Sequence, residues 1–201
     1  MMKEIIISKY GEPSVLQVRE NPIPTPGKNE ILIRNHFTGI NFSEIMARMR
    51  LYPGAPSPPT TLGAEGCGVI ESLGENVTKF QEGQRVMVFS RYASYATHIC
   101  TNQDMVMPLP DQFSLEEGAA FPVIYITAYM MMFDLGNFRE GETILIHGAG
   151  GGVGTAAIQL AQATRGNIIG TASAWKHEKL KVMGVEAVKS STPEVCRGKI
   201  K

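Results

Sequence analysis

The stretch TILIHGAGGGVGTAAIQLAQ, residues 143–162, places an apolar run, a cluster of glycines and a helix-forming run directly after one another. The cluster contains the spacing Ala149-x-Gly151-x-x-Gly154, which departs from the dinucleotide fingerprint G-x-G-x-x-G only at its first position. Because the cluster follows a strand pattern and opens a helix pattern, it predicts a cradle for the phosphates of a dinucleotide. A glycine-rich turn kept only for close packing is the alternative interpretation.

Each position of the cluster has an expected task. Gly151 lets the backbone approach a pyrophosphate, and Gly154 lets the helix pack closely on the strand. The amides at the helix start, from Gly152 onward, face the phosphate, whose negative charge the helix dipole favours. The predicted phosphate-binding residues are Ala149, Gly151, Gly152, Val153 and Gly154.

The end of the second strand indicates which dinucleotide is bound. A site that prefers NAD carries Asp or Glu there, about twenty residues after the glycines, to bind the ribose 2′-hydroxyl. Here the sequence is GTASAWKHEK, residues 170–179, in which Ser173 and Lys176 offer a hydroxyl and a cation at the strand end. This pair suits the 2′-phosphate of NADP, to which His177 and Lys179 add positive charge. Alternatively, these three basic residues form only the solvated first turn of a helix.

The pattern around the cluster alternates strand and helix. ETILIHG and NIIGTAS read as strands, and GVGTAAIQLAQAT and KHEKLKVMG read as helices, which together predict a βαβ unit with a parallel sheet. Upstream, Ser114 and Glu117 form a capping box at a helix start. A second helix, about residues 125–135, is expected to end at Gly136 as its C-cap glycine.

The first half of the chain reads differently. EIIIS, LQVRE, EILIRNHF, GCGVIESLG, RVMVF and YATHIC are short strand-type runs separated by Gly and Pro. Such runs predict a compact antiparallel barrel or sandwich, with NFSEIMARM as its one helical insertion. We therefore place a domain boundary near residue 120.

Composition excludes several classes of function. The chain has 201 residues and a formal net charge of +0, so no global field attracts nucleic acid or an anionic membrane. Cys67, Cys100 and Cys196 are widely spaced and form no C-x-x-C pair, which indicates neither a disulfide framework nor a Cys-rich zinc site. Reducing cytoplasm is the expected compartment.

Two segments are candidates for membrane signals. The N-terminus has too short an apolar run for a signal peptide. Residues 119–133 fall short of the roughly 20 apolar residues that a spanning helix needs, and Pro122 interrupts them. We expect a buried interface helix there and no transmembrane segment.

Several longer runs together resemble a known family. The runs are GINFSEIMARMRLYP, PPTTLGAEGCGVIESLGENV, EGQRVMVF, GETILIHGAGGGVG and GTAS. Their order is typical of the zinc-free quinone oxidoreductase, zeta-crystallin-like branch of the medium-chain dehydrogenase/reductase superfamily. YITAYMMMFDLGNFREG and GTASAWKHEKLK look most like the vesicle amine transport protein group within it. The resemblance spans about residues 3–188.

The resemblance implies a fold and a reaction. A barrel-like, GroES-like catalytic domain is expected over residues 1–120, followed by a partial Rossmann domain over residues 121–188 and a divergent tail over residues 189–201. In the family, NADPH lies in the cleft between the two domains, and a hydride passes to a quinone or another conjugated carbonyl. The family also implies a homodimer.

The resemblance also assigns residues. Asn41 matches the family's asparagine near the nicotinamide, Tyr52 its tyrosine at the lip of the active site, and Thr127 a position lining the nicotinamide. Alternatively, Tyr52 is an ordinary loop tyrosine and Thr127 is a threonine in a helix interior. Without a metal, catalysis would rest on positioning and a polar pocket.

Some positions depart from the relatives. Ala64 stands where the zinc-dependent cousins have a ligating His, and the cousins' four-cysteine lobe is absent, so no metal is expected. His36, His98 and His147 are read as structural. Glu44 replaces a usual Asp and Met46 replaces a tyrosine of some quinone reductases, which leaves the substrate open.

The family's Rossmann domain has six strands, of which this sequence shows two and the edge of a third. We therefore expect an incomplete domain and weak or no catalysis by the chain alone. A catalytically weak protein that acts by contacts with partners or a membrane surface is the competing hypothesis. An enoyl-thioester reductase or zinc-free alcohol oxidoreductase would differ from the first hypothesis only in substrate.

Overall fold

The computed structural model describes residues 1–190, which form two compact units, Met1–Val123 and the part that begins at Ile124. The division falls in the first turn of helix α3 (Pro122–Tyr129), close to the boundary expected near residue 120. The two units are described one at a time below.

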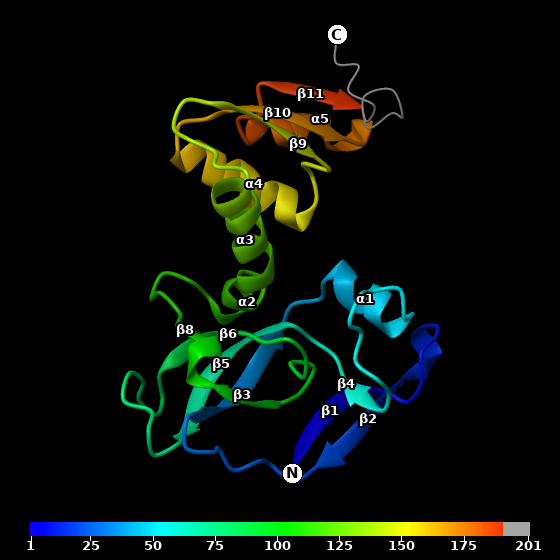
Figure 1. Ribbon diagram of the computed structural model, residues 1–201, viewed down its shortest axis with the longest axis vertical. Coiled ribbons are helices and arrows are strands. Elements are labelled where there is room, and N and C mark those ends of the chain that lie inside the picture. The colour runs from blue at the N-terminus through cyan, green and yellow to red at the C-terminus, as the bar shows by residue number, and fades with distance from the viewer. Residues whose placement is uncertain (191–201) are drawn as a thin grey trace. The chain divides into compact units, whose positions relative to one another are not determined.

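Unit 1 consists of two antiparallel sheets, with strand orders β7-β3-β5-β6-β8 and β2-β1-β4 (Figure 1). The larger sheet is curled into half a barrel. Its strands and those of the smaller sheet are β1 (Met2–Ile7), β2 (Leu16–Asn21), β3 (Glu30–Thr38), β4 (Thr60–Thr61), β5 (Glu65–Leu73), β6 (Arg85–Phe89), β7 (His98–Asn102) and β8 (Val106–Pro108). The sequence did not predict β4 and β8, because two and three residues are too short to show a period.

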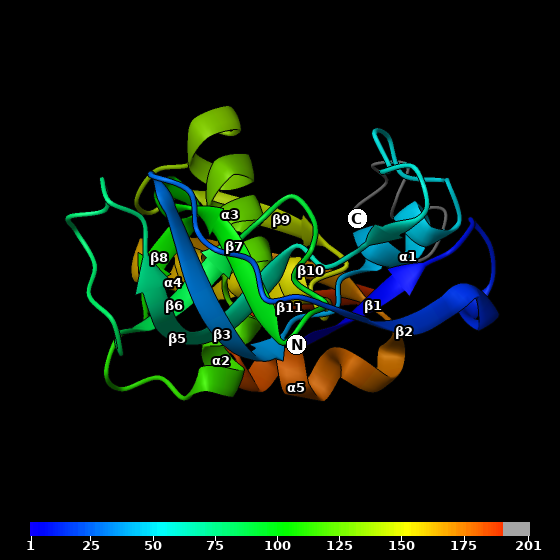
Figure 2. The same cartoon turned by 90° about the horizontal axis from the view of Figure 1, so that it is seen from below.

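The core of the larger sheet is centred on β3, which pairs with β7 on one side and β5 on the other (Figure 2). Ile31, Leu32 and Ile33 are consecutive and all buried, so both faces of this strand are covered. Short helix α2 (Leu115–Ala119) packs on β3, β5 and β6. A Cβ on Gly118 would lie 2.5 Å from Leu109 Cδ1 and 2.7 Å from Cys67 Sγ of β5, so a larger residue here would require these side chains to move.

The helices of unit 1 begin at residues whose side chains or backbone cap them. Helix α1 (Phe42–Arg48) begins after Asn41, its N-cap. At α2, the Ser114 hydroxyl accepts from the Glu117 amide at 3.2 Å and the Glu117 carboxylate accepts from the Ser114 amide at 2.8 Å, which confirms the predicted capping box. Single 3-10 turns, η1 (Pro13–Val15) and η2 (Gln103–Met105), precede β2 and β8.

Unit 2 is a parallel sheet of order β11-β10-β9 with helices packed on it (Figure 1). Its elements after α3 are η3 (Met130–Leu135), β9 (Thr143–His147), α4 (Gly152–Ala163), β10 (Asn167–Ala172), η4 (Ala174–Lys176), α5 (His177–Val182) and β11 (Ala187–Ser190). Ile146, Ile158 and Ile168 form the centre of its core. The predicted βαβ unit is present, because β9 and β10 run parallel and α4 connects them.

Two details of unit 2 differ from the sequence predictions. The predicted helix over residues 125–135 is an α-helix that becomes a π-helix at Met130, and Gly136 caps it with φ −85°, in the right-handed region. The left-handed residue is Asn137, with φ 48°. Lys189 and Ser190, assigned to a tail without strand character, belong to β11, and the rest of that tail lies outside the described residues.

Candidate functional site

The glycine cluster forms a tight turn between β9 and α4. Gly148 has φ +67°, a left-handed conformation that glycine adopts without steric cost. The Ala149 amide donates to the Thr171 carbonyl oxygen at 2.9 Å, and the Gly151 amide donates to the Gly148 carbonyl oxygen at 2.9 Å. These bonds fix the turn against β10, and Gly151 becomes the N-cap of α4.

Small residues let the helix approach this turn. A Cβ on Gly154 would lie 2.5 Å from the Gly148 carbonyl oxygen and 2.7 Å from Ala149 Cα. Ala149 is fully buried, and a Cβ on Gly170 would lie 3.0 Å from the Ala149 Cβ. Larger side chains at positions 149 and 154 would therefore push the turn away from α4 or from β10.

The first turn of α4 presents amide groups at this point. The N–H groups of Gly152, Val153 and Gly154 belong to the first helical turn, which has no intrahelical acceptors for them. They carry the positive end of the helix dipole, and Gly151 and Gly152 are exposed. A groove of about 1150 Å³ in unit 2 is lined by these residues and by β9. The cradle therefore fits an anionic group such as a pyrophosphate.

Ser173 and Lys176 lie in one turn at the end of β10, where η4 begins. The Lys176 amide donates to the Ser173 carbonyl oxygen at 2.9 Å, and the Lys176 ammonium donates to the Gly150 carbonyl oxygen at 2.8 Å. Lys176 Nζ also lies 4.9 Å from the centre of the Trp175 ring, which is 74% exposed. The structure thus brings this lysine to the glycine turn, whereas the His177 ring contacts the Ala172 carbonyl oxygen at 3.1 Å.

The sequence analysis did not identify two residues of this turn, Gly150 and Thr171. A Cβ on Gly150 would lie 2.5 Å from Lys176 Cδ, so this glycine makes room for the lysine. The buried Thr171 hydroxyl contacts the Gly148 amide at 3.3 Å and His147 Nδ1 at 3.2 Å. Glycine repetition around position 150 was the available signal for the first. Thr127, predicted to line the nicotinamide, is half-buried in α3.

Asn41 and Tyr52 flank α1 in unit 1. Asn41 Nδ2 donates to Glu65 Oε1 at 2.8 Å, and the Asn41 amide donates to the Glu44 carboxylate. Tyr52 follows the helix in a loop, is 42% exposed, and its carbonyl oxygen accepts from the Ala55 amide at 3.1 Å. Asn41 is therefore held firmly, whereas the ring of Tyr52 is open to solvent.

Two buried carboxylates lie beside Asn41: Glu44, noted in the sequence only as a replacement for Asp, and Glu65, which the sequence analysis did not identify. Glu44 also accepts from the Ala64 amide at 2.9 Å, and Glu65 accepts from the Val123 amide at 2.8 Å. Burial raises the pKa of Glu65, as does the Glu44 charge, while the hydrogen bonds from Val123 and Asn41 lower it. Glu44 thus fixes the start of α1 through its hydrogen bonds to the Asn41 and Ala64 amides.

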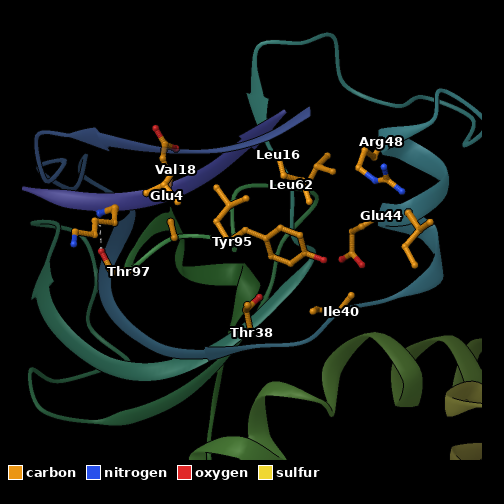
Figure 3. Close-up of a pocket in the computed structure, with 14 residues that line it drawn as sticks. Glu4, Leu16, Val18, Thr38, Ile40, Glu44, Arg48, Leu62, Tyr95 and Thr97 are labelled. Atoms are coloured by element: carbon orange, nitrogen blue, oxygen red, sulfur yellow. Dashed lines mark hydrogen bonds between the residues drawn. The ribbon is translucent and has the colours of Figure 1, made fainter. Parts of the chain in front are cut away.

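A second cavity, of about 490 Å³, lies within unit 1 beside this cluster (Figure 3). Its wall is mainly apolar and includes Leu16, Val18, Ile40 and Leu62. The Tyr95 hydroxyl points toward the Glu44 carboxylate, and burial, followed by the charge and hydrogen bonding of Glu44, raises the pKa of Tyr95. Asn41 and Tyr52 are not part of this wall.

Two of the histidines contact other polar side chains. His98 Nε2 lies 3.3 Å from Glu71 Oε2, and His147 contacts Thr171 as described above. Within residues 1–190, no three His, Cys, Asp or Glu side chains lie close enough together to hold a metal ion. No helix in the same range is long and apolar enough to cross a membrane.

Comparisons with known proteins agree with this architecture. Residues 27–111 match the family model "Alcohol dehydrogenase GroES-like domain". The chain is 38% identical over 181 residues to the synaptic vesicle membrane protein VAT-1 homolog-like of Mus musculus, covering 90% of this chain and 43% of that protein. It is 35% identical over 182 residues to the quinone oxidoreductase of Mus musculus, covering 90% of this chain and 55% of that protein. The chain thus spans about half the length of these relatives.

A solved structure extends the comparison to both units. The crystal structure of Escherichia coli quinone oxidoreductase complexed with NADPH superposes with a TM-score of 0.86 at 31% identity, covering 97% of this chain and 61% of that one. Unit 1 is therefore a GroES-like domain and unit 2 is part of a Rossmann domain, which confirms the predicted fold class. The chain belongs to the medium-chain dehydrogenase/reductase superfamily and is similar there to the VAT-1 homologues and the quinone oxidoreductases.

Proposed function

We propose that this protein is an NADPH-dependent oxidoreductase that transfers a hydride to a quinone or another conjugated carbonyl without zinc. The observation that supports this proposal most strongly is the turn at residues 148–154. There, positive φ at Gly148, the close contact at Gly154 and the exposed start of α4 together form an anion cradle. The similarity to quinone oxidoreductases supports the redox reaction.

The amides of Gly152 and Val153 would bind the pyrophosphate, which the backbone at Gly151 would approach closely, with Ala149 and Gly154 holding the turn in place. Ser173 and Lys176 would bind the 2′-phosphate, since the strand end carries a hydroxyl and a cation and no carboxylate. This arrangement favours NADPH over NADH. Thr127 would contact the nicotinamide.

NADPH, when bound, supplies the hydride, and a quinone takes up one proton from solvent as it becomes a hydroquinone. Asn41 would orient the substrate by donating a hydrogen bond to a carbonyl oxygen. Tyr52 would donate a second hydrogen bond or stack on a flat substrate. Both groups act by positioning and by stabilising charge on oxygen, which does not require a metal.

The direct test measures NADPH oxidation at 340 nm by the purified chain with a panel of quinones and enals. Saturable, substrate-dependent oxidation with one hydroquinone formed for each NADPH consumed supports the proposal. Weak rates are expected, because the chain spans about half the length of its relatives. If no substrate in the panel accelerates NADPH oxidation while the protein unfolds cooperatively, the enzymatic proposal fails.

A second candidate function is a weakly catalytic protein that binds partners or a membrane surface. The observation that favours it is the 38% identity to a protein named as a synaptic vesicle membrane protein. Pelleting of the chain with anionic phospholipid vesicles tests the membrane-surface contact, and a chain that stays in the supernatant contradicts that contact. We further propose a cytoplasmic location, which the free thiols of Cys67 and Cys100 support. We also propose a homodimer, which light scattering would test.

A further inference from the structure

Glu65 is a buried carboxylate at the start of β5. It is 1% exposed, and no ion pair to it occurs within residues 1–190. Its two oxygens have separate donors: Asn41 Nδ2 reaches Oε1 at 2.8 Å and the Val123 amide reaches Oε2 at 2.8 Å. A buried charge without a cation is costly, and these two hydrogen bonds are what offsets that cost here.

The backbone leaves a space for this carboxylate at Gly39. A Cβ on Gly39 would lie 2.1 Å from Glu65 Oε1 and 2.6 Å from Glu65 Cδ. Any other residue at position 39 would therefore displace the Glu65 side chain. Gly39 lies two residues before Asn41, so the same short segment provides both the space and the hydrogen-bond donor.

The chemistry of this contact fixes the orientation of Asn41. An ionised carboxylate can only accept hydrogen bonds, so the Asn41 carboxamide must turn its NH₂ group toward Glu65. One N–H of this group is then engaged and the other is left to donate elsewhere. Glu44 holds the backbone amide of the same residue, so both the main chain and the side chain of Asn41 are anchored.

We propose that Glu65 is a positioning residue that sets the Asn41 carboxamide as a hydrogen-bond donor toward the substrate carbonyl. This inference rests on the proposed function, because it gives Asn41 a task in the hydride transfer. Glu65 also fixes the first turn of α3 through the Val123 amide. One buried carboxylate therefore anchors both Asn41 and the Val123 amide within unit 1.

Glu65→Gln tests the proposal. Glutamine must direct its own NH₂ group at one of the two donors, so the contact to Asn41 is lost or the Asn41 amide turns over. We expect kcat/KM for a quinone to fall roughly 10- to 100-fold, the size of effect that a misplacement of about 1 Å produces. The Kd for NADPH is expected to stay within about twofold, since the phosphate cradle is untouched.

Glu4→Gln is the matched control. Glu4 is also a buried carboxylate of unit 1, 6% exposed, and accepts from Arg19, Asn21 and Thr61. The same substitution there is expected to lower the melting temperature but to leave kcat/KM unchanged. An equal loss of kcat/KM in both variants would show that Glu65 acts only through stability and would overturn the proposal.

Gly39→Ala disturbs the hydrogen bond between Asn41 and Glu65 without changing Glu65 itself. This variant replaces Glu65→Gln in the test if Glu65→Gln does not fold. Both variants are also followed by the ¹⁵N–¹H signals of the Asn41 side chain, assigned with Asn41→Asp. We expect these signals to shift in Glu65→Gln and Gly39→Ala and not in Glu4→Gln. Unchanged signals would overturn the positioning role even if the unmodified chain proved inactive, so failure of the proposed function remains distinguishable.

Discussion

Replacing Gly154 by Ala changes the distance between α4 and the glycine turn. The new Cβ would lie 2.5 Å from the Gly148 carbonyl oxygen and within 2.8 Å of two Ala149 backbone atoms, whereas ordinary contacts begin at 3.4 Å. All three neighbours are backbone atoms, so the turn must retreat by more than half an ångström. The anion cradle would then lose its alignment with the first turn of α4.

Two opposing effects set the change in stability. Overpacking costs about 1–3 kcal/mol, and the better helix propensity of Ala returns about 1 kcal/mol. We expect a net loss of about 1 kcal/mol, which lowers the melting temperature of a chain of this length by about 2–4 °C. Losing one hydrogen bond to a charged phosphate costs about 1.5–3 kcal/mol, which weakens NADPH binding roughly 10- to 100-fold.

The assay compares NADPH titration and thermal unfolding of Gly154→Ala with those of Ala163→Gly. Ala163 is the exposed last residue of α4, so its replacement by Gly lowers helix stability, by up to about 1 kcal/mol, without touching the turn. We expect the control to bind NADPH normally. Normal binding by Gly154→Ala, or an equal loss in Ala163→Gly, would refute the reasoning.

Three further predictions follow from the site. Lys176→Ala is expected to weaken NADPH binding about tenfold and to leave NADH binding unchanged, because only NADPH carries the 2′-phosphate; calorimetric titration of both cofactors checks this. Tyr52→Phe is expected to lower kcat/KM for a quinone roughly fivefold with unchanged NADPH affinity, and steady-state kinetics with equal rates would contradict a role for the hydroxyl. In a Cys196→Ser background, Cys67 and Cys100 are expected to resist a disulfide reagent at pH 8 until the chain unfolds, because burial raises the pKa of each thiol to about 11, with the Glu30 charge adding to this at Cys100. Fast reaction of the folded chain would show that these thiols are accessible.

Features set by neighbouring residues could be predicted from the sequence. Three such features depend on only a few consecutive residues each. They are the capping box at Ser114, the unit of β9, glycine turn and α4, and the position of Ser173 and Lys176. Their chemistry is local, so the spacing alone indicates it. The end of η3 at Gly136, its C-cap, was predicted in the same way, although the left-handed residue there is the following Asn137.

Features that depend on distant residues could not be predicted in this way. Glu65 and Asn41 are 24 residues apart and meet only because β5 pairs with the end of β3. The sequence contains a weak signal at two positions: Gly39 is a glycine shortly before the candidate Asn41, and Glu65 is an acid at the start of a buried strand. Hydrophobic periodicity does not show that two such distant residues are in contact. The two-residue strand β4 was missed because it is too short to show a period and because its partner, β1, is distant in the sequence.

The central claim is that the turn at residues 148–154 and the lysine beside it bind NADPH. The most direct measurement is a titration of the purified chain with NADPH and then NADH, followed by the fluorescence of Trp175. This residue is the only tryptophan, and its exposed ring lies 4.9 Å from Lys176 Nζ. We predict saturable quenching by NADPH at least tenfold tighter than by NADH, about 1.4 kcal/mol. No saturation with either cofactor, in a protein that unfolds cooperatively, would contradict the account.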